Sequence, residues 1–141
     1  MNGAVRLVIV DDHAMMRETW KMILEKHPQI TVIDTCSSGA EAIECAAFKQ
    51  PDIMLMDINM EPINGFDATR IISENQPDVK IIGLSINNQP TYARNLMQLG
   101  AKGYVTKNSS PDELHKAIFA VMEGGTYVCN DVARQLPPSE K

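Results

Sequence analysis

Cysteines and long apolar runs are scarce in this sequence, and both shortages exclude classes of protein. The cysteines are an odd set of three, Cys36, Cys45 and Cys129, and none of them forms a C-x-x-C pair. That favours buried, idle thiols in a reducing, cytoplasmic compartment over a disulfide framework, a redox motif or a metal site. No apolar run approaches the ~20 residues of a membrane span. The first run ends in two aspartates, so we expect neither a membrane partner nor a signal peptide.

Positive charge is also in short supply. The 141 residues carry 18 acids against 13 bases, which gives a formal net charge of −5 and a pI near 5.1. This balance argues against the chain gripping nucleic acid on its own. Hydrophobic residues make up 44% and charged residues 22%, which is ordinary for a globular protein. The length then predicts a single domain with its own core.

Glycine-rich phosphate loops are missing as well. Neither G-x-x-x-x-G-K-[ST] nor G-x-G-x-x-G follows the first apolar run, and no G-x-S-x-G elbow occurs. The turn after that run instead carries Asp11 and Asp12, which repel phosphate unless a cation joins them. Nucleotide sites of those two kinds and an α/β-hydrolase site are therefore excluded.

Two kinds of segment alternate along the chain. Short, β-branched runs occupy residues 7–10, 30–35, 53–56, 79–85 and 103–106, and such runs are typical of strands buried on both faces. Each is followed by a segment whose apolar residues recur at helical spacing, around Trp20, Ala46, Ile72, Leu96 and Ile118. This order predicts an α/β fold with a parallel five-stranded sheet and helices on both faces.

Capping residues and glycines mark where the helices begin and end. Ser37 or Ser38 precedes the second helix and Ser109 or Ser110 the fifth, which has Pro111 in its first turn. Gly100 follows the fourth helix as a C-terminal stop. From Thr126 the chain leaves this pattern, so we expect a domain over residues 1–125 and a tail or linker over residues 126–141.

Side chains with chemistry follow four of the predicted strands. Asp11 and Asp12 follow the first, Asp57 the third, Ser85 ends the fourth and Lys107 follows the fifth. Ligands bind beyond the carboxyl ends of parallel strands, so we expect these groups to converge. Close carboxylates need a cation, and an oxygen-only set suits Mg²⁺. A carboxylate beside Mg²⁺, with a lysine and a hydroxyl as helpers, can act as a nucleophile toward a phosphoryl group.

These motifs together resemble the receiver domain of bacterial two-component response regulators. The resemblance runs from about residue 5 to residue 125. It rests on Asp11-Asp12, on Asp57-Ile-Asn-Met with Gly65 downstream, on Ser85, and on Gly100-Ala-Lys-Gly-Tyr-Val-Thr-Lys107. Each motif alone is weak, but all of them in this order and spacing are highly specific. The family implies a flavodoxin-like, doubly wound (βα)5 fold and a regulatory role rather than that of an enzyme.

The resemblance implies a role for each acid. Asp57 resembles the phosphoacceptor, Asp12 a direct Mg²⁺ ligand, and Asp11 an acid that binds the metal largely through water. The backbone carbonyl of Asn59 would complete the protein ligands. Ser85, Lys107 and Tyr104 resemble the switch hydroxyl, the lysine that pairs with the phosphoryl group, and the aromatic side chain that swings inward on activation.

The Asp-Asp-His start and the Ser-Pro-Asp-Glu-Leu segment at 110–114 look most like receivers joined to a LuxR-type (NarL/FixJ-like) helix-turn-helix domain, which this chain lacks. The implied function is a switch that takes a phosphoryl group from a histidine kinase or phosphotransfer protein. It would then change its homodimer or effector contacts and so control transcription. The alternative is a stand-alone receiver that signals by protein–protein contact. An aspartyl phosphatase of the same architecture is disfavoured, because Asn59 stands where those enzymes usually carry an acid.

Some residues depart from the family or invite a second interpretation. Glu61 stands where the family usually has proline, and Ile86 is bulkier than the small residue common there. Either could affect kinase docking, metal affinity or access to Asp57, or could do nothing. We interpret His13 as a first-turn surface residue rather than a ligand. His27 and His115, which have no acid or thiol at ligand spacing, are expected to be solvated.

Overall fold

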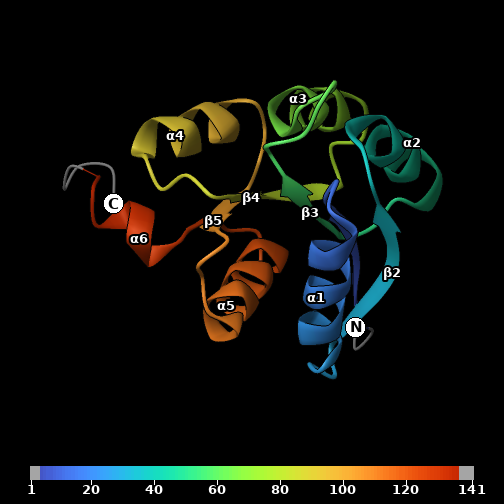
Figure 1. The fold of residues 1–141 in the computed structure, drawn as a ribbon, viewed down its shortest axis with the longest axis horizontal. Helices are drawn as coiled ribbons and strands as arrows, with labels where there is room; N and C mark the ends of the chain where they lie inside the picture. Colours follow the sequence, from blue (N-terminus) through green and yellow to red (C-terminus); the bar gives the residue numbers. More distant parts are fainter. Residues whose placement is uncertain (1–3, 137–141) are drawn as a thin grey trace.

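The computed structural model describes residues 4–136, which form a parallel sheet covered by helices (Figure 1). The strands are β1 (Val5–Val10), β2 (Ile30–Cys36), β3 (Ile53–Asp57), β4 (Lys80–Ser85), β5 (Gly103–Thr106) and β6 (Tyr127–Val128). The helices are α1 (Ala14–Glu25), α2 (Gly39–Lys49), α3 (Gly65–Asn75), α4 (Pro90–Gln98), α5 (Pro111–Met122) and α6 (Asn130–Ala133). The sheet order is β2-β1-β3-β4-β5-β6, and every neighbouring pair is parallel.

The helices cover both faces of the sheet, as expected. In Figure 1, α2, α3 and α4 lie along one side, and α1 and α5 lie on the other. Every residue of the central strand β3 is buried, which explains why its sequence is a continuous apolar run. Burying each large aliphatic side chain in such a core contributes roughly 1.5–3 kcal/mol. The core therefore fixes the strand ends on which the site is built.

The predicted strand count was one too low. Tyr127 and Val128 pair in register with Gly103 and Tyr104, so β6 extends the sheet to six strands, and α6 packs near α4. A strand of two residues and a helix of four residues have no measurable periodicity, so sequence patterning could not reveal them. The expected tail therefore begins as part of the folded structure. Its last residues, 137–141, lie outside the described residues, and the boundary at residue 125 stays a prediction.

The predicted caps at two helix starts are confirmed, and the structure identifies the capping residues as Ser38 and Ser110. The Ser38 hydroxyl accepts a hydrogen bond from the Glu41 N–H at 3.1 Å, and the Ser110 hydroxyl accepts one from the Glu113 N–H at 3.1 Å. Satisfying these N–H groups is worth about 1 kcal/mol at each helix. Gly100 adopts φ +117°, a left-handed conformation that suits a C-terminal stop.

The expectation for two histidines is corrected by the packing of α1 and α5. His27 and His115 are half-buried, with their ring centroids 4.9 Å apart, and the His27 ring also lies 5.0 Å from that of Phe119. Burial lowers the pKa of His115. The cysteines are free and buried, as predicted, and burial raises the pKa of Cys36 and Cys45. Between residues 4 and 136, no helix combines the length and apolarity that crossing a membrane requires.

Candidate functional site

The topology brings the predicted site residues to one edge of the sheet. β1, β3, β4 and β5 are consecutive neighbours in the sheet, so their carboxyl ends adjoin. Val10 pairs with Met56, and Ser85 pairs with Thr106. Asp11 directly follows Val10, Asp57 follows Met56, and Lys107 follows Thr106. The convergence expected from the sequence is therefore confirmed.

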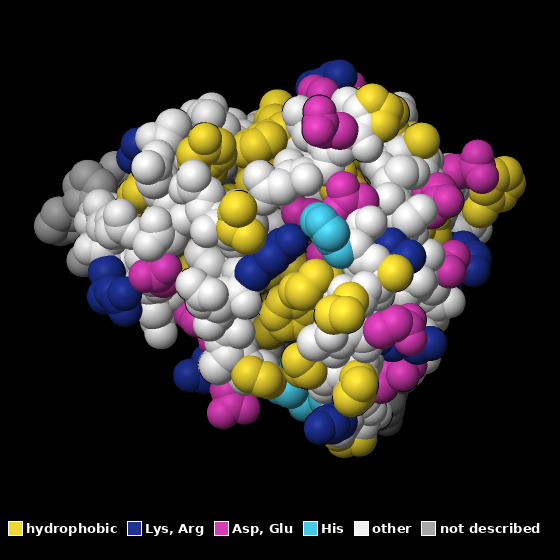
Figure 2. Space-filling model, in the orientation of Figure 1, with side chains coloured by type: hydrophobic (Ala, Val, Ile, Leu, Met, Phe, Trp, Pro, Cys, Tyr) yellow, Lys and Arg dark blue, Asp and Glu magenta, His cyan; other side chains and the backbone are white. Residues whose placement is uncertain are grey.

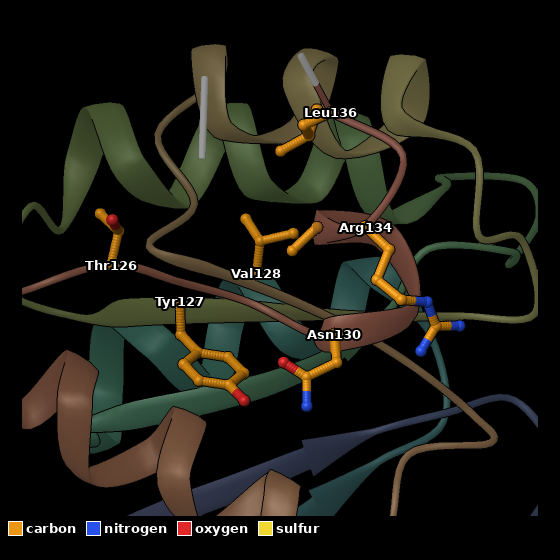
Figure 3. Close-up of a pocket in the computed structure, with 7 residues that line it drawn as sticks. Thr126, Tyr127, Val128, Asn130, Arg134 and Leu136 are labelled. Carbon is orange, nitrogen blue, oxygen red and sulfur yellow. The ribbon is translucent and has the colours of Figure 1, made fainter. Parts of the chain in front are cut away.

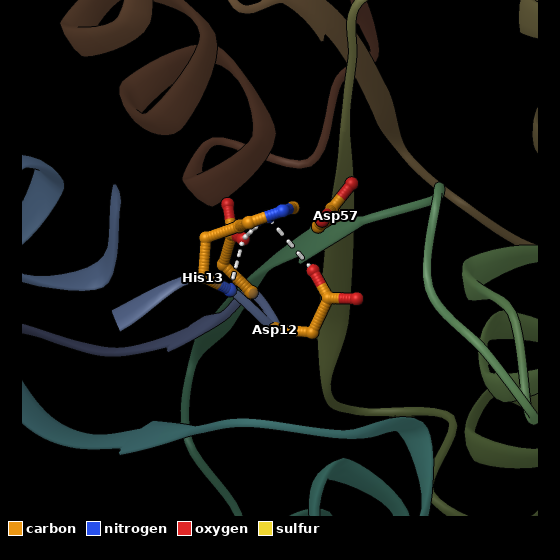
Figure 4. A group of neighbouring side chains, drawn as sticks. Asp12, His13 and Asp57 are labelled. Atoms are coloured by element: carbon orange, nitrogen blue, oxygen red, sulfur yellow. Dashed lines mark hydrogen bonds and ion pairs between the residues drawn. The ribbon is translucent and has the colours of Figure 1, made fainter. Parts of the chain in front are cut away.

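The acidic side chains form a compact cluster at this edge (Figure 4). Ligand atoms of Asp11, Asp12, His13 and Asp57 all lie within 4.8 Å of one another. The Asp11 and Asp57 side chains are completely buried, whereas Asp12 is partly exposed. Buried carboxylates are normally hydrogen-bonded or paired. The Oδ2 atoms of Asp11 and Asp57, however, have no hydrogen-bond partner.

Lys107 supplies only part of the positive charge that this cluster needs. Its Nζ lies 3.6 Å from Asp11 Oδ2 and 3.6 Å from Asp57 Oδ1. Burial raises the pKa of Asp57, and the negative charges of Asp11 and Asp12 act in the same direction. The hydrogen bond from Asn59 N–H and the charge of Lys107 oppose that rise in pKa. The site thus holds carboxylates whose repulsion a divalent cation would relieve.

Two local features hold Asp57 in place. The Asn59 N–H donates a hydrogen bond to Asp57 Oδ1 at 2.9 Å, which leaves the other carboxylate oxygen unused. Gly65, the first residue of α3, packs so closely that an added Cβ would lie 2.3 Å from Ile58 Cα and 2.7 Å from the Asp57 carbonyl oxygen. Only glycine fits this approach, which explains the Gly65 motif seen in the sequence. The role of the Asn59 carbonyl as a ligand stays a prediction.

The predicted switch residues meet at the loop after β4. Ser85 is fully buried, and its hydroxyl accepts a hydrogen bond from the Asn87 N–H at 2.9 Å. Tyr104 is also fully buried and donates its hydroxyl proton to the Asn87 carbonyl at 2.6 Å. Burial raises the pKa of Tyr104. Tyr104 is therefore turned inward in this structure and is bonded to the same loop residue as Ser85.

A connection from that loop to α6 was not anticipated. The Asn88 side-chain amide donates a hydrogen bond to Asp131 Oδ2 at 3.0 Å, and Gln135 Nε2 donates one to the Asn88 carbonyl at 2.9 Å. The Cys129 N–H also donates to the Tyr104 carbonyl at 3.0 Å. The Asn88–Asp131 and Asn88–Gln135 bonds join residues more than 40 positions apart, so no local sequence signal could have found them.

The surface around the site is mixed in character. Figure 2 shows acidic, basic and histidine side chains beside one another near the middle of this face, with hydrophobic side chains next to them. Met15 of α1 is 81% exposed, and Ile86, which follows Ser85, is 73% exposed. Because Ile86 faces solvent, it does not fill the site. Its influence on docking and that of the exposed Glu61 stay open.

A separate hollow lies on the α6 side of the molecule (Figure 3). It encloses about 700 Å³ and is lined in part by Tyr127, Val128, Arg134 and Leu136. Arg134 already pairs with Asp131 at 2.9 Å. This lining holds no acid or thiol among the described residues, so the chemistry of the protein is better placed at the acidic edge.

Comparison with known proteins agrees with this geometry. The family model described as "Response regulator receiver domain" matches residues 7–119. The chain is 38% identical over 132 residues to a "Transcriptional regulatory protein DegU" of Brevibacillus brevis, spanning 94% of this chain and 56% of that relative. It is 35% identical over 136 residues to a "Response regulator UvrY" of Escherichia coli K12, spanning 96% of this chain and 62% of that relative.

A crystal structure gives the same picture. A two-component response regulator of the LuxR family from Aurantimonas sp. SI85-9A1 superposes with a TM-score of 0.90 at 31% identity. The match covers 94% of this chain and 95% of that one.

Proposed function

This chain belongs to the family of response regulator receiver domains, and from this membership we propose that it is a phosphorylation-dependent switch with Asp57 as the phosphoacceptor. The observation that carries the proposal is the buried Asp57 carboxylate, whose Oδ2 has no hydrogen-bond partner. Asn59 holds the other oxygen, and Lys107 lies 3.6 Å from it. One oxygen is thus positioned as a nucleophile beside a fixed positive charge.

The proposed cofactor is Mg²⁺, held by Asp11, Asp12, Asp57 and the backbone carbonyl of Asn59. The chain offers the hard oxygen donors that Mg²⁺ prefers, and Asp11 Oδ2 is a buried carboxylate oxygen with no hydrogen-bond partner. When bound, the ion neutralises charge that would otherwise repel an incoming phosphoryl group.

The proposed donor is the phosphohistidine of a histidine kinase or of a phosphotransfer protein. Asp57 Oδ2 forms a bond to phosphorus while the bond from phosphorus to the imidazole nitrogen breaks, and the leaving imidazole takes up a proton. The Lys107 ammonium group pairs with one phosphoryl oxygen, and the Ser85 hydroxyl donates a hydrogen bond to another. Phosphorylation and dephosphorylation of its own Asp57 are the only reactions that the proposal includes.

The contacts after β4 support a route for the signal. The Ser85 hydroxyl accepts a hydrogen bond from the Asn87 N–H, so a rotation of Ser85 toward a phosphoryl group on Asp57 would act on this loop residue. Tyr104 is bonded to the same loop residue, and the adjacent Asn88 is bonded to α6. We therefore infer that phosphorylation changes how α6, and the chain that follows it, is held against the domain.

The proposed output is control of transcription through a helix-turn-helix domain outside this chain. Its support is the similarity to DegU, a transcriptional regulatory protein, and to the LuxR-family response regulator. Because the chain spans only about 56–62% of the DegU and UvrY relatives, those proteins include sequence beyond the matched part, where an effector would fit. The stand-alone receiver is therefore the weaker alternative. The proposal also includes a cytoplasmic location.

A phosphorylation-dependent homodimer is part of the proposed output. Either α1 with α5, or α4 with β5 and α5, could form its face. Added charge and new oxygen acceptors at Asp57 would act on both faces through the loop after β4 and through the loop that carries Lys107.

Intact mass spectrometry after incubation with acetyl phosphate and Mg²⁺ tests the phosphoacceptor. Wild-type protein should gain one phosphoryl group, and the gain should disappear with EDTA and in Asp57→Asn. Asp67→Asn removes an exposed acid near the start of α3 and is the matched control, which should react like the wild type. Equal labelling of wild type and Asp57→Asn would refute Asp57 as the acceptor.

A further inference from the structure

His13 is directed at the acids of the site rather than at the helix that it precedes. It occupies the N-cap position of α1 but makes no side-chain capping bond. Its ring Nδ1 lies 2.9 Å from Asp12 Oδ1 and 3.2 Å from Asp11 Oδ1. Figure 4 shows this arrangement, with dashed lines joining the histidine to the carboxylate oxygens. The sequence-based interpretation of His13 as a plain surface residue does not account for this orientation.

The spacing of these donor atoms matches that of neighbouring ligands around one metal ion. With bonds of about 2.1 Å in an octahedral site, adjacent donors are roughly 3.0 Å apart. The separations of His13 Nδ1 from the two aspartate oxygens, 2.9 and 3.2 Å, fall on either side of that value. His13 Nδ1 therefore lies close enough to each aspartate oxygen to bind one ion together with it.

A second observation points independently to a cation at this place. Asp11 Oδ2 and Asp57 Oδ2 are buried within the acidic cluster and have no hydrogen-bond partner. Lys107 Nζ lies 3.6 Å from both Asp11 Oδ2 and Asp57 Oδ1, so a single ammonium group is shared between two buried carboxylates. The buried carboxylate oxygens therefore carry more negative charge than Lys107 compensates. The imidazole of His13 adds a nitrogen donor to the same cluster.

We propose that His13 is a nitrogen ligand of the divalent cation and that it shifts the preference of the site from Mg²⁺ toward Mn²⁺ and its borderline neighbours. This inference rests on the proposed function, since it concerns the metal used there. Mg²⁺ is hard and prefers oxygen donors, whereas imidazole binds the transition metals well. A cluster with aspartate oxygens and one imidazole nitrogen suits Mn²⁺ better than an all-oxygen cluster does. The largely exposed ring of His13 can adjust to the ion with little repacking.

Pulsed electron paramagnetic resonance of bound Mn²⁺ tests the ligand directly. The wild-type protein should show the ¹⁴N modulation of a bound imidazole, and His13→Gln should lose it. His27→Gln removes a histidine that packs against His115 and Phe119 instead, so it should keep the signal. By calorimetry, His13→Gln should weaken Mn²⁺ binding by about tenfold or more and change Mg²⁺ binding much less.

The possible failures are separable. If Mn²⁺ binds to the wild type without ¹⁴N modulation, or if His13→Gln weakens both ions equally, His13 is not a ligand and the proposed function is untouched. If neither ion binds to the folded wild type, the metal of the proposed function fails together with this inference. Circular dichroism of His13→Gln establishes that any loss occurs in a folded protein.

Discussion

Replacing Asp57 by asparagine should stabilise the metal-free protein, although it removes the residue on which function depends. Asp57 is completely buried beside Asp11 and near Asp12, with Lys107 as the cation at hand. Asparagine keeps an oxygen that can accept the hydrogen bond from the Asn59 N–H, so that contact can survive. The change therefore removes mainly the charge.

The size of the effect follows from the distances. At the outer limit of 4.8 Å, two like charges repel by roughly 3–4 kcal/mol at an effective dielectric constant of about 20. Lys107 Nζ, 3.6 Å from Asp57 Oδ1, offsets roughly 4–5 kcal/mol on the same scale. Repulsion from Asp12 is weakened further by solvent, because that side chain is 35% exposed. A net gain of about 1–2 kcal/mol remains for Asp57→Asn.

Urea and thermal unfolding in EDTA at neutral pH measure this gain. A stabilisation of this size corresponds to a rise in Tm of roughly 4–8 °C for a domain of this length. Asp67→Asn makes the same change in net charge at an exposed position and should stay within about 0.5 kcal/mol of the wild type. A less stable Asp57→Asn protein, or an equal gain in stability for Asp67→Asn, would refute the claim that the negative charge of the site exceeds what Lys107 compensates.

Three further outcomes are expected. Because the pKa of Asp57 is raised in the folded state, its ionised carboxylate destabilises the protein most at high pH; the effect diminishes as the pH falls through the folded-state pKa and is absent below the unfolded value of 3.8. The difference in unfolding free energy between Asp57→Asn and wild type should therefore narrow as the pH falls from neutral, and a constant difference would contradict this. Gly65→Ala, whose Cβ would lie 2.3 Å from Ile58 Cα, should cost about 2–3 kcal/mol by urea unfolding, and a loss below about 0.5 kcal/mol would refute the steric argument. Asn88→Ala removes the hydrogen bond to Asp131, so amide exchange in α6 should quicken by about two- to fivefold while β4 stays protected; unchanged exchange in α6 would exclude the connection.

The sequence predicted the parts of the fold that depend on local pattern. The central strand β3 is a continuous apolar run ending in Asp57, and the helices carry their caps at Ser38 and Ser110. Since the carboxyl ends of parallel strands lie at one edge of a sheet, the convergence of Asp11, Asp57 and Lys107 on that edge also followed from the alternation of strands and helices.

The rest depended on contacts that no local pattern encodes. The two residues of β6 are too few to show an alternation of apolar and polar side chains. They pair with the edge of β5 that faces away from β4, which is a long-range contact. The bonds of Asn88 to α6 and of Tyr104 to Asn87 join distant residues through polar atoms. The His13 side chain is oriented toward Asp12 by the charges that the folded structure brings together. None of these can be deduced from spacing alone.

The most direct test of the central claim is to locate the phosphoryl group chemically. Borohydride reduces an aspartyl phosphate to homoserine, which peptide mass spectrometry then assigns to one position. After reaction of the wild type with acetyl phosphate and Mg²⁺, the account predicts conversion at Asp57 and at no other aspartate. Conversion at Asp11 or Asp12, or none at Asp57 in a folded, metal-bound protein, would contradict it.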